Sequence, residues 1–245
     1  MTKTYWKVII AYIIMQFSGI IGVPIMLKLG VGEGLERAAR ESLLFSYWIT
    51  ISFIVGLLVI LWILRTDFRE KDFRSAQASW PSTILWSVLG FFMALFGQGI
   101  AASIQQLLFG IEPGSENTQQ IMNLIMSSAA VIIAVTVAGP ILEEIIFRKI
   151  IFGTLYKKFN FAVGLIVSSL LFALVHQDYK HLLIYFVMGS IFAFLYVKTN
   201  RILVPIIAHV AMNSFVVLVQ YVFKDQIEEY LEQLEQMQGF IKFFM

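Results

Sequence analysis

The chain has 245 residues, of which 59% are hydrophobic and 14% are charged, and its formal net charge is +2. Soluble domains are typically about 45–50% apolar and about 25% charged, so this composition indicates a membrane protein. It excludes a disordered chain, a nucleic-acid-binding domain and an ordinary cytosolic enzyme. The sequence has no cysteine, which excludes disulfides, thiolate metal ligands, a cysteine nucleophile and palmitoylation.

Long apolar stretches predict the fold class. A transmembrane helix needs about 20 mostly apolar residues. Seven stretches lack Asp, Glu, Lys, Arg and His and are the candidate spans: 8–27, 42–64, 75–111, 117–142, 159–175, 182–197 and 202–223. The third is long enough for a span plus an interfacial piece. We therefore expect an all-α fold, a polytopic membrane bundle of about seven or eight transmembrane helices.

The sequence also predicts three parts within a single integral domain. N-terminal transmembrane helices occupy 1–120, and a helical core at 121–223 carries the ionisable residues of the spans. In the tail at 224–245, apolar residues such as Ile227 and Leu234 recur at helical spacing between acidic residues. This pattern predicts an amphipathic helix that lies on the membrane or against another subunit. We expect a multi-pass protein of the lipid bilayer, in the plasma membrane of a bacterium.

Ionisable side chains inside membrane spans are costly, so each is a functional candidate by default. Glu143 and Glu144 directly follow a charge-free run and the Gly139-Pro140 pair. Glu144 and Arg148 are four residues apart and share one helix face, where they can pair. Glu143 then lies about 100° away on the helix, free to face a cavity. The simpler interpretation is a juxtamembrane charge cluster that marks topology.

Two histidines complete the set of candidates. His176 ends an apolar run and, taken alone, could be a packed histidine whose ring is satisfied. His209 and Asn213 are four residues apart on the last span, where such a pair could simply hydrogen-bond across helices. However, nearly all the histidines and carboxylates within the spans, these residues and the two glutamates, lie in three adjacent elements.

Spacing along the chain predicts that Glu143 and His176 meet. The segment 157–160 is a natural turn between antiparallel helices, and Glu143 lies 17 residues before position 160, with His176 16 residues after it. At about 1.5 Å per residue, both lie about 25 Å from the turn and at nearly the same level. A helical hairpin would bring them together, provided that the first helix continues through Arg148.

Three short motifs follow one another in this part of the chain. They are Glu-Glu-x-x-x-Arg, Phe-x-x-x-His and His-x-x-x-Asn, at Glu143-Glu144 with Arg148, Phe172 with His176, and His209 with Asn213. In this order they resemble the CAAX-processing and bacteriocin-processing (CPBP, or Abi) family of intramembrane proteases, which includes the type 2 CAAX prenyl endopeptidases. The resemblance covers roughly residues 135–220, and the earlier chain matches only as hydrophobic spans.

The resemblance implies an intramembrane endopeptidase with a catalytic core at 121–223 and a membrane-associated peptide or protein as its substrate. It implies that Glu143 is the general base and that His176 positions the water. It further implies that His209 and Asn213 stabilise the oxyanion, and that Glu144 and Arg148 are a supporting pair. Peptide hydrolysis needs a base, an activated water and donors aimed at the tetrahedral intermediate. Without cysteine or a Gly-x-Ser-x-Gly elbow, water is the expected nucleophile.

The sequence is compatible with hydrolysis that depends on a metal ion and with hydrolysis that does not. Glu143, His176 and His209 would suffice for a catalytic zinc, which keeps its fourth position for water. The sequence has no His-Glu-x-x-His motif, and Asn is a poor zinc ligand. We therefore favour glutamate-type hydrolysis without a cofactor, with a zinc-dependent protease as the alternative.

Two non-proteolytic functions also remain. One is a non-catalytic membrane protein on the same scaffold, such as an immunity protein that blocks a toxin. The other is a small transporter in which Glu143 and the histidines relay protons. Transporters of that kind usually contain internal repeats, and none is visible in this sequence. The composition predicts no nucleic-acid partner for any of these functions.

Overall fold

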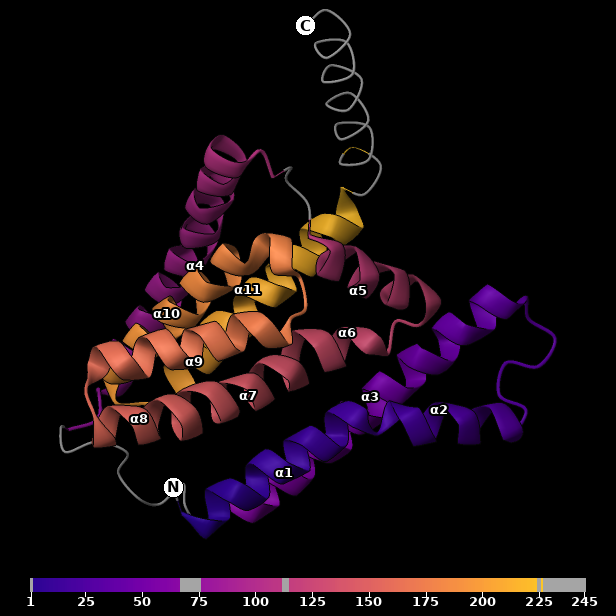
Figure 1. Cartoon of the computed structure of the whole chain (residues 1–245), viewed down its shortest axis with the longest axis horizontal. Helices are drawn as coiled ribbons and strands as arrows, with labels where there is room; N and C mark the ends of the chain where they lie inside the picture. The colour runs from indigo at the N-terminus through magenta and orange to yellow at the C-terminus, as the bar shows by residue number, and fades with distance from the viewer. Residues whose placement is uncertain (1, 67–75, 112–114, 224–225, 227–245) are drawn as a thin grey trace, which may run out of the picture.

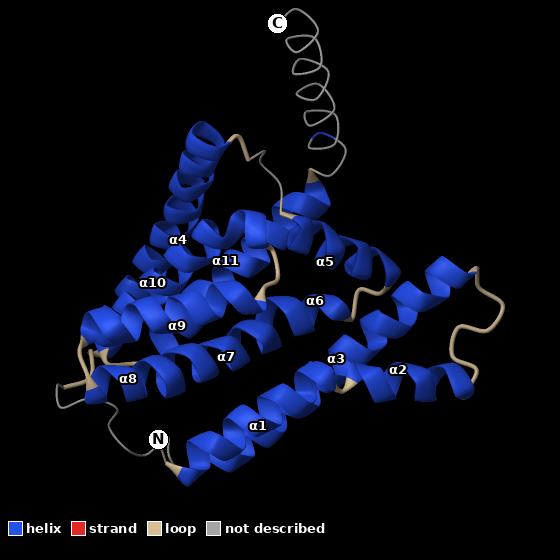
Figure 2. Cartoon of the chain, viewed as in Figure 1, coloured by secondary structure: helices blue, strands red, loops and turns tan. Residues whose placement is uncertain are grey.

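The computed structural model describes residues 2–66, 76–111, 115–223 and 226, and every regular element in these ranges is helical (Figure 2). This confirms the all-α prediction. Apart from Gln226, the amphipathic tail predicted at 224–245 lies outside the described residues. The longer helices are α1 (Lys3–Phe17), α2 (Gly19–Lys28), α3 (Arg37–Leu64), α4 (Trp80–Phe109), α5 (Glu116–Ser127), α9 (Phe161–Val175), α10 (Leu182–Thr199) and α11 (Leu203–Val222).

Between α5 and α9 the chain forms one continuous helical rod, from 131 to 158 (Figure 1). Its successive parts are α6 (Val131–Ile133), the π-helical turn η2 (Ala134–Ala138), α7 (Gly139–Glu143), the π-helical segment η3 (Glu144–Phe152) and α8 (Gly153–Lys158). After the rod, Asn160 caps the N-terminus of α9, and its side chain accepts a hydrogen bond from the Val163 N–H at 3.0 Å. The helix thus continues through Arg148, and the predicted hairpin is confirmed.

Fewer helices qualify as membrane spans than the apolar stretches suggested. Four helices in the described ranges are long and apolar enough to cross a bilayer: α3, α4, α11 and Tyr179–Thr199, in which the short 3₁₀ turn η4 (Tyr179–His181) leads into α10. α1 and α2 add a fifth only if they count as one span bent by 42°. α9 is apolar but has 15 residues. The described chain therefore offers four or five candidate spans by length and composition.

Two expected spans differ from the structure. The stretch 117–142 is divided, because Ser128 takes an extended conformation (φ −159°, ψ 118°) and ends α5 before the rod begins. Polar residues from Asn117 to Asn123 recur along α5, so this helix is amphipathic rather than apolar. The stretch 75–111 contains one helix of 30 residues, α4, instead of a span with a separate interfacial piece.

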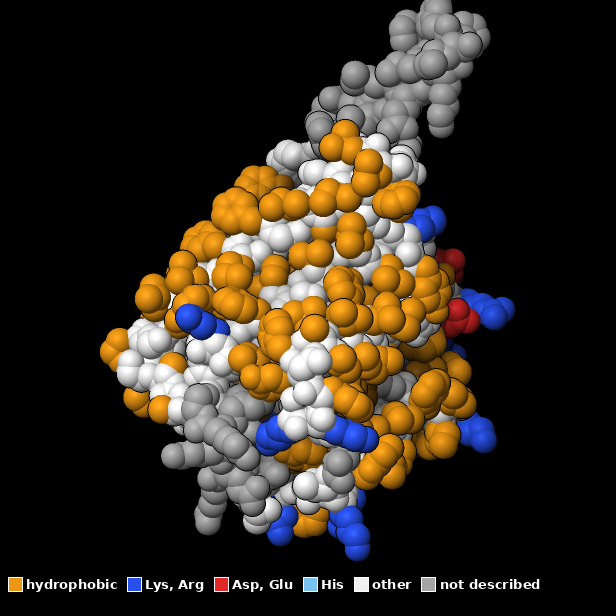
Figure 3. Space-filling view, turned by 60° about the vertical axis from the view of Figure 1, so that its left-hand side comes forward, with side chains coloured by type: hydrophobic (Ala, Val, Ile, Leu, Met, Phe, Trp, Pro, Cys, Tyr) orange, Lys and Arg blue, Asp and Glu red, His pale blue; other side chains and the backbone are white. Residues whose placement is uncertain are grey.

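The helices form two groups. α1 and α2 pack on α3, while α9, α10 and α11 pack against the rod and α4 packs on α10 and α11. α3 joins the groups through its contacts with α5, η2 and α7 (Figure 1). Hydrophobic side chains cover most of the face shown in Figure 3, with Lys and Arg mainly near its edges. A soluble protein rarely exposes an apolar surface this extensive, whereas a bilayer requires one. The molecule is a multi-pass membrane protein.

Candidate active site

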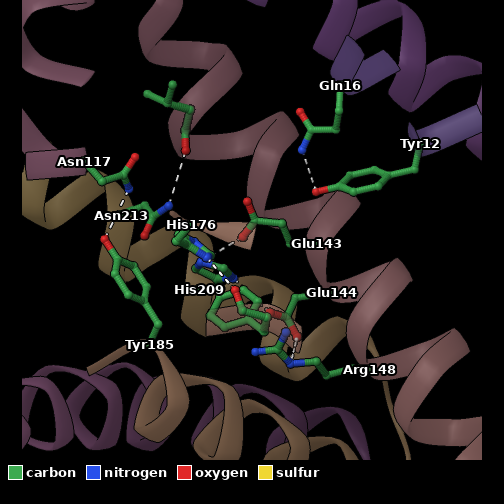
Figure 4. A network of polar contacts seen from close by, with 12 residues as sticks. Tyr12, Gln16, Asn117, Glu143, Glu144, Arg148, His176, Tyr185, His209 and Asn213 are labelled. Carbon is green, nitrogen blue, oxygen red and sulfur yellow. Dashed lines mark hydrogen bonds and ion pairs between the residues drawn. The ribbon is translucent and has the colours of Figure 1, made fainter. Parts of the chain in front are cut away.

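The structure brings the predicted site residues together in the interior of the second helix group. They come from the rod, from the end of α9 and from α11 (Figure 4): Glu143, Glu144 and Arg148, then His176, then His209 and Asn213. We call four of them, Glu143, Glu144, Arg148 and His209, the carboxylate cluster.

Glu144 and Arg148 form a buried ion pair, as their spacing predicts. Arg148 Nε lies 3.1 Å from Glu144 Oε2, and the side chains are 1% and 0% exposed. The contact satisfies the distance of an ion pair but not the alignment of a hydrogen bond. The other carboxylate oxygen, Oε1, accepts a hydrogen bond from His209 Nδ1 at 2.9 Å. Glu144 therefore links the rod to α11, a contact that the sequence did not indicate.

Aromatic rings surround the Arg148 guanidinium. Its Cζ atom lies 4.2 Å from the ring centroid of Phe172 and 5.3 Å from that of Phe192. Among the described residues, neither Nη1 nor Nη2 has a hydrogen-bond partner. Cation–π attraction to two ring faces, strengthened by desolvation, supplies part of what those missing hydrogen bonds would give. The Phe of the Phe-x-x-x-His motif thus supports the Arg of the preceding motif.

Glu143 lies in a different environment from its neighbour. Its side chain is 20% exposed, and its Oε2 atom lies 3.7 Å from His209 Nε2. Consecutive residues of a helix point about 100° apart, so burial of Glu144 turns Glu143 towards the open side of the cluster. Figure 4 shows Glu143 beside His176 and His209, as the hairpin geometry predicted.

The hydrogen-bond partners of both histidines determine which ring nitrogen carries a proton. His176 Nδ1 lies 2.7 Å from the backbone oxygen of Phe172, and His209 Nδ1 bonds the Glu144 carboxylate. Carbonyl and carboxylate oxygens only accept hydrogen bonds, so both Nδ1 atoms are donors. In its neutral form each imidazole consequently has an unprotonated Nε2 atom available for a water or a substrate.

Asn213 contacts a carbonyl that the π-helical turn leaves without a backbone donor. The Gly139 N–H donates to the Ala134 oxygen, five residues back. The next donor in this register would be residue 140, but a proline has no N–H, so the Val135 oxygen lacks its helical partner. Asn213 Nδ2 donates to that oxygen at 3.3 Å (Figure 4). One N–H of Asn213 is thus used in fixing α11 to the rod.

Sequence reasoning missed three residues around this site. The Tyr185 ring stacks on His176 with centroids 4.2 Å apart and an interplanar angle of 26°. On α1, Gln16 Nε2 donates to the Tyr12 hydroxyl at 2.9 Å, and both side chains face Glu143 in Figure 4. The spacing of four between Tyr12 and Gln16 within an apolar stretch was an available signal. Tyr185 offered none, since one tyrosine in an apolar helix is unremarkable in sequence.

No three His, Asp or Glu side chains in the described ranges are arranged to hold a metal ion. The set considered for zinc, Glu143, His176 and His209, therefore does not fit a three-ligand site in these positions.

Comparison with known proteins places this site in a family. The sequence model of the family described as type II CAAX prenyl endopeptidase Rce1-like matches residues 125–215, a range that includes all six predicted site residues. The chain is 49% identical to the candidate membrane peptidase YdiL of Bacillus subtilis (strain 168) over 235 residues, 95% of this chain and 94% of YdiL. It is 36% identical to the membrane-embedded CAAX protease MroQ of Staphylococcus aureus (strain USA300) over 156 residues, 61% of this chain and 63% of MroQ.

No solved structure matches the chain. The relatives nevertheless confirm the resemblance carried by the three motifs, because the match to YdiL extends over nearly the whole of both proteins. The chain belongs to the Rce1-like type II CAAX prenyl endopeptidase (CPBP) family of membrane proteases.

Proposed function

We propose that this protein is an intramembrane endopeptidase that hydrolyses a peptide bond of a membrane-associated peptide or protein, with water as the nucleophile. The observation that carries the proposal is the contrast between two adjacent carboxylates. Glu144 is fully buried and paired with Arg148, whereas Glu143 is partly exposed beside two histidines. Such a division is what hydrolysis needs, since one carboxylate supports the site while the other remains available as a base.

In the proposed reaction, Glu143 removes a proton from a water that also donates a hydrogen bond to Nε2 of His176. The oxygen of that water attacks the substrate carbonyl carbon, and the carbonyl oxygen becomes the oxyanion. The proton held by Glu143 then passes to the amide nitrogen as the C–N bond breaks, releasing a carboxylic acid and an amine. The Nδ1 bond of His176 to Phe172 supports this role because it leaves Nε2 as the acceptor.

The oxyanion is stabilised by His209 and Asn213. His209 already donates from Nδ1 to Glu144, so donation from Nε2 requires the imidazolium form, and the carboxylates of Glu143 and Glu144 lie on its two sides. Asn213 uses one N–H on Val135 and has a second N–H to offer. Donors fixed in place before the reaction stabilise developing charge most effectively, and the contact with Val135 provides that fixation.

The site lies within the membrane in this proposal, because the rod and α9 cross it together with the four or five candidate spans. The continuous helix at 131–158 is about 40 Å long at about 1.5 Å per residue. Three of its charged residues, Glu144, Arg148 and Lys149, are buried inside the protein, so lipid does not contact them. Counting α1 and α2 as one bent span then gives seven spans.

The test is proteolysis of a fluorogenic membrane-peptide library by the purified protein, comparing the wild type with Glu143→Gln. This change keeps the shape of the side chain and removes the base, so turnover should be abolished while the fold is retained, as monitored by size-exclusion chromatography in detergent. Glu41→Gln, at an exposed carboxylate of α3, is the matched control and should leave turnover unchanged. Near-normal turnover in folded Glu143→Gln would overturn the assignment in favour of a non-catalytic protein on the same scaffold.

A further inference from the structure

A second polar cluster lies next to His176, and Figure 4 shows its members Tyr185 and Asn117 across His176 from Glu143. We call it the tyrosine cluster: Ser115, Asn117, Asp178, His181 and Tyr185. Ser115 Oγ lies 2.7 Å from Asp178 Oδ2 and 3.1 Å from the Tyr185 hydroxyl. Asn117 Nδ2 lies 3.2 Å from the same hydroxyl, and His181 Nδ1 lies 2.9 Å from Asp178 Oδ1. The cluster therefore joins the start of α5, the loop between α9 and α10, and α10 itself.

The chemistry of these groups fixes the direction of every hydrogen bond in the cluster. The Asp178 carboxylate only accepts, so Ser115 gives it its single hydroxyl hydrogen. Tyr185 must then donate to Ser115 and accept from the Asn117 amide. The result is an unbroken chain of donors and acceptors that ends at the carboxylate. Such connected networks are more rigid than isolated hydrogen bonds because breaking one leaves buried groups unpaired.

The hydroxyl end of this chain holds the ring that packs on His176. The Tyr185 and His176 rings are nearly parallel, with centroids 4.2 Å apart. The Phe172 ring also contacts His176, edge-on, with centroids 4.6 Å apart. The single hydrogen bond from Nδ1 to Phe172 fixes one point of the imidazole but leaves its plane free to tilt. The stacked tyrosine restricts that tilt.

The loop next to His176 also depends on the cluster. Gln177 follows His176 directly and adopts a left-handed conformation with φ of 56°. This conformation costs a non-glycine residue roughly 1–2 kcal/mol, so it persists where surrounding contacts enforce it. Asp178, the next residue, is buried and hydrogen-bonded to both Ser115 and His181. The cluster thus holds the backbone of His176 as well as its ring.

We propose that Tyr185 is a positioning residue for hydrolysis, tethered through Ser115 to Asp178, which sets the plane of the His176 imidazole so that Nε2 points at the water beside Glu143. This inference rests on the proposed function, in which His176 aligns that water. Tyr185 does not touch the reacting atoms in this role. Its effect passes through the orientation of His176, and a small misalignment of a catalytic group is costly because reaction requires near-attack geometry.

Three substitutions separate the tether from the ring. Tyr185→Phe keeps the stacked ring and removes the hydroxyl, whereas Ser115→Ala breaks the same link without altering the ring. Each should lower kcat about tenfold with KM within about twofold, because misalignment acts on the reaction step rather than on binding. Tyr185→Leu removes the ring as well and should lower kcat about a hundredfold. Ser103→Ala, at an exposed serine of α4, is the matched control and should leave kcat unchanged.

Two further measurements distinguish positioning from plain structural support. Ser115→Thr retains the hydroxyl and should restore kcat to within about twofold of the wild type. In a His176→Ala background, Tyr185→Phe should cause no further loss, because its effect acts through the missing imidazole. The inference is overturned if folded Tyr185→Phe keeps its wild-type kcat, or if its effect is unchanged without His176. Glu143→Gln in the same assay tests the proposed function by itself, so abolished turnover there together with unaffected Tyr185→Phe would reject only the tyrosine tether.

Discussion

The carboxylate cluster and the tyrosine cluster flank the same histidine but are built on different principles. In the first, Glu144 and Arg148 are buried charges, and the guanidinium is surrounded by rings rather than by hydrogen-bond acceptors. In the second, each hydroxyl or amide donor in the chain from Asn117 to Asp178 has an acceptor. Charged groups in a low-dielectric interior can transfer protons and stabilise developing charge, whereas a network of matched donors and acceptors fixes the positions of side chains. The comparison suggests that the two clusters divide these tasks around His176.

The largest effect should follow from breaking the buried ion pair. Arg148→Ala leaves the Glu144 carboxylate without its cation in the protein interior, and removing one partner of a buried pair typically costs about 3–5 kcal/mol. We expect a loss of that order in folding free energy, seen as lower thermal stability and a smaller monodisperse fraction in detergent.

The chain contains a matched control for this prediction. Arg37 and Glu41 have the same spacing of four and a contact of 2.9 Å, but their side chains are 91% and 53% exposed. Arg37→Ala should hardly change the thermal stability, because exposed pairs contribute little. Equal losses in both variants would show that burial does not distinguish the two pairs.

The next effect concerns Asn213, which has both a proposed catalytic role and a structural contact. Asn213→Ala removes an oxyanion donor and should lower turnover about 10²–10³-fold, or roughly 3–4 kcal/mol, with little change in substrate binding. It also leaves the partly buried Val135 oxygen without its side-chain donor, so stability should fall by about 0.5–1.5 kcal/mol.

Pro140→Ala separates the loss of turnover from the loss of stability, because it restores a backbone N–H that can donate to the Val135 oxygen. In the double variant the stability cost of Asn213→Ala should shrink, while the loss of turnover per folded molecule should remain. Thermal unfolding and turnover measured on the four proteins of this cycle provide the answer. A turnover loss that disappears together with the stability loss would identify Asn213 as a purely structural residue.

The difference between the clusters also explains what could be predicted from the sequence. Carboxylates and histidines are rare in apolar runs, so Glu143, Glu144 and His176 were conspicuous, and helix spacing sufficed to pair Glu144 with Arg148. The bond between Glu144 and His209 joins residues 65 positions apart, and no local pattern encodes it. Its prediction requires the placement of α11 against the rod.

The tyrosine cluster was missed for a related reason. Ser115, Asn117 and Asp178 lie at helix starts and in a loop, where polar residues are ordinary, and they come together only through the fold. The helix break at Ser128 has no glycine or proline to signal it, so the apolar run 117–142 predicted one span where the structure has α5 and the start of the rod. The lack of a backbone donor for the Val135 oxygen could not be predicted either, because the missing N–H of Pro140 affects that oxygen only in the π-helical register.

A smaller effect should appear in the pH dependence of the tyrosine cluster. Burial raises the pKa of the Asp178 carboxyl, but hydrogen bonds from His181 and Ser115 outweigh it and hold this pKa below its usual value. A carboxylate with a depressed pKa in the folded state stabilises the protein above its unfolded-state pKa of about 4, and the stabilisation is lost as the pH falls through the folded-state pKa.

Asp178→Asn should accordingly lower stability by about 1.5–3 kcal/mol at neutral pH, the range for hydrogen bonds to a charged group. The difference in melting temperature between wild type and variant should stay constant down to about pH 5 and shrink below about pH 4. Thermal melts in detergent from pH 7 to pH 3 measure it. A gap that widens on acidification would show that the neutral acid, not the carboxylate, is the stabilising form.

The smallest expected effect is that of chelators. A zinc shared by Glu143, His176 and His209 would need all three ligand atoms about 2.0–2.2 Å from one point. The described residues do not form such a group, although Glu143 Oε2 and His209 Nε2 are 3.7 Å apart. We expect strong chelators to leave turnover unchanged and the purified protein to carry no stoichiometric zinc. One zinc per chain, with activity lost on stripping and restored on re-addition, would require His176 to join the other two ligands. The stacked Tyr185 would then orient a metal ligand. The carboxylate cluster would hold the ion, and the tyrosine cluster would position His176 as one of its ligands.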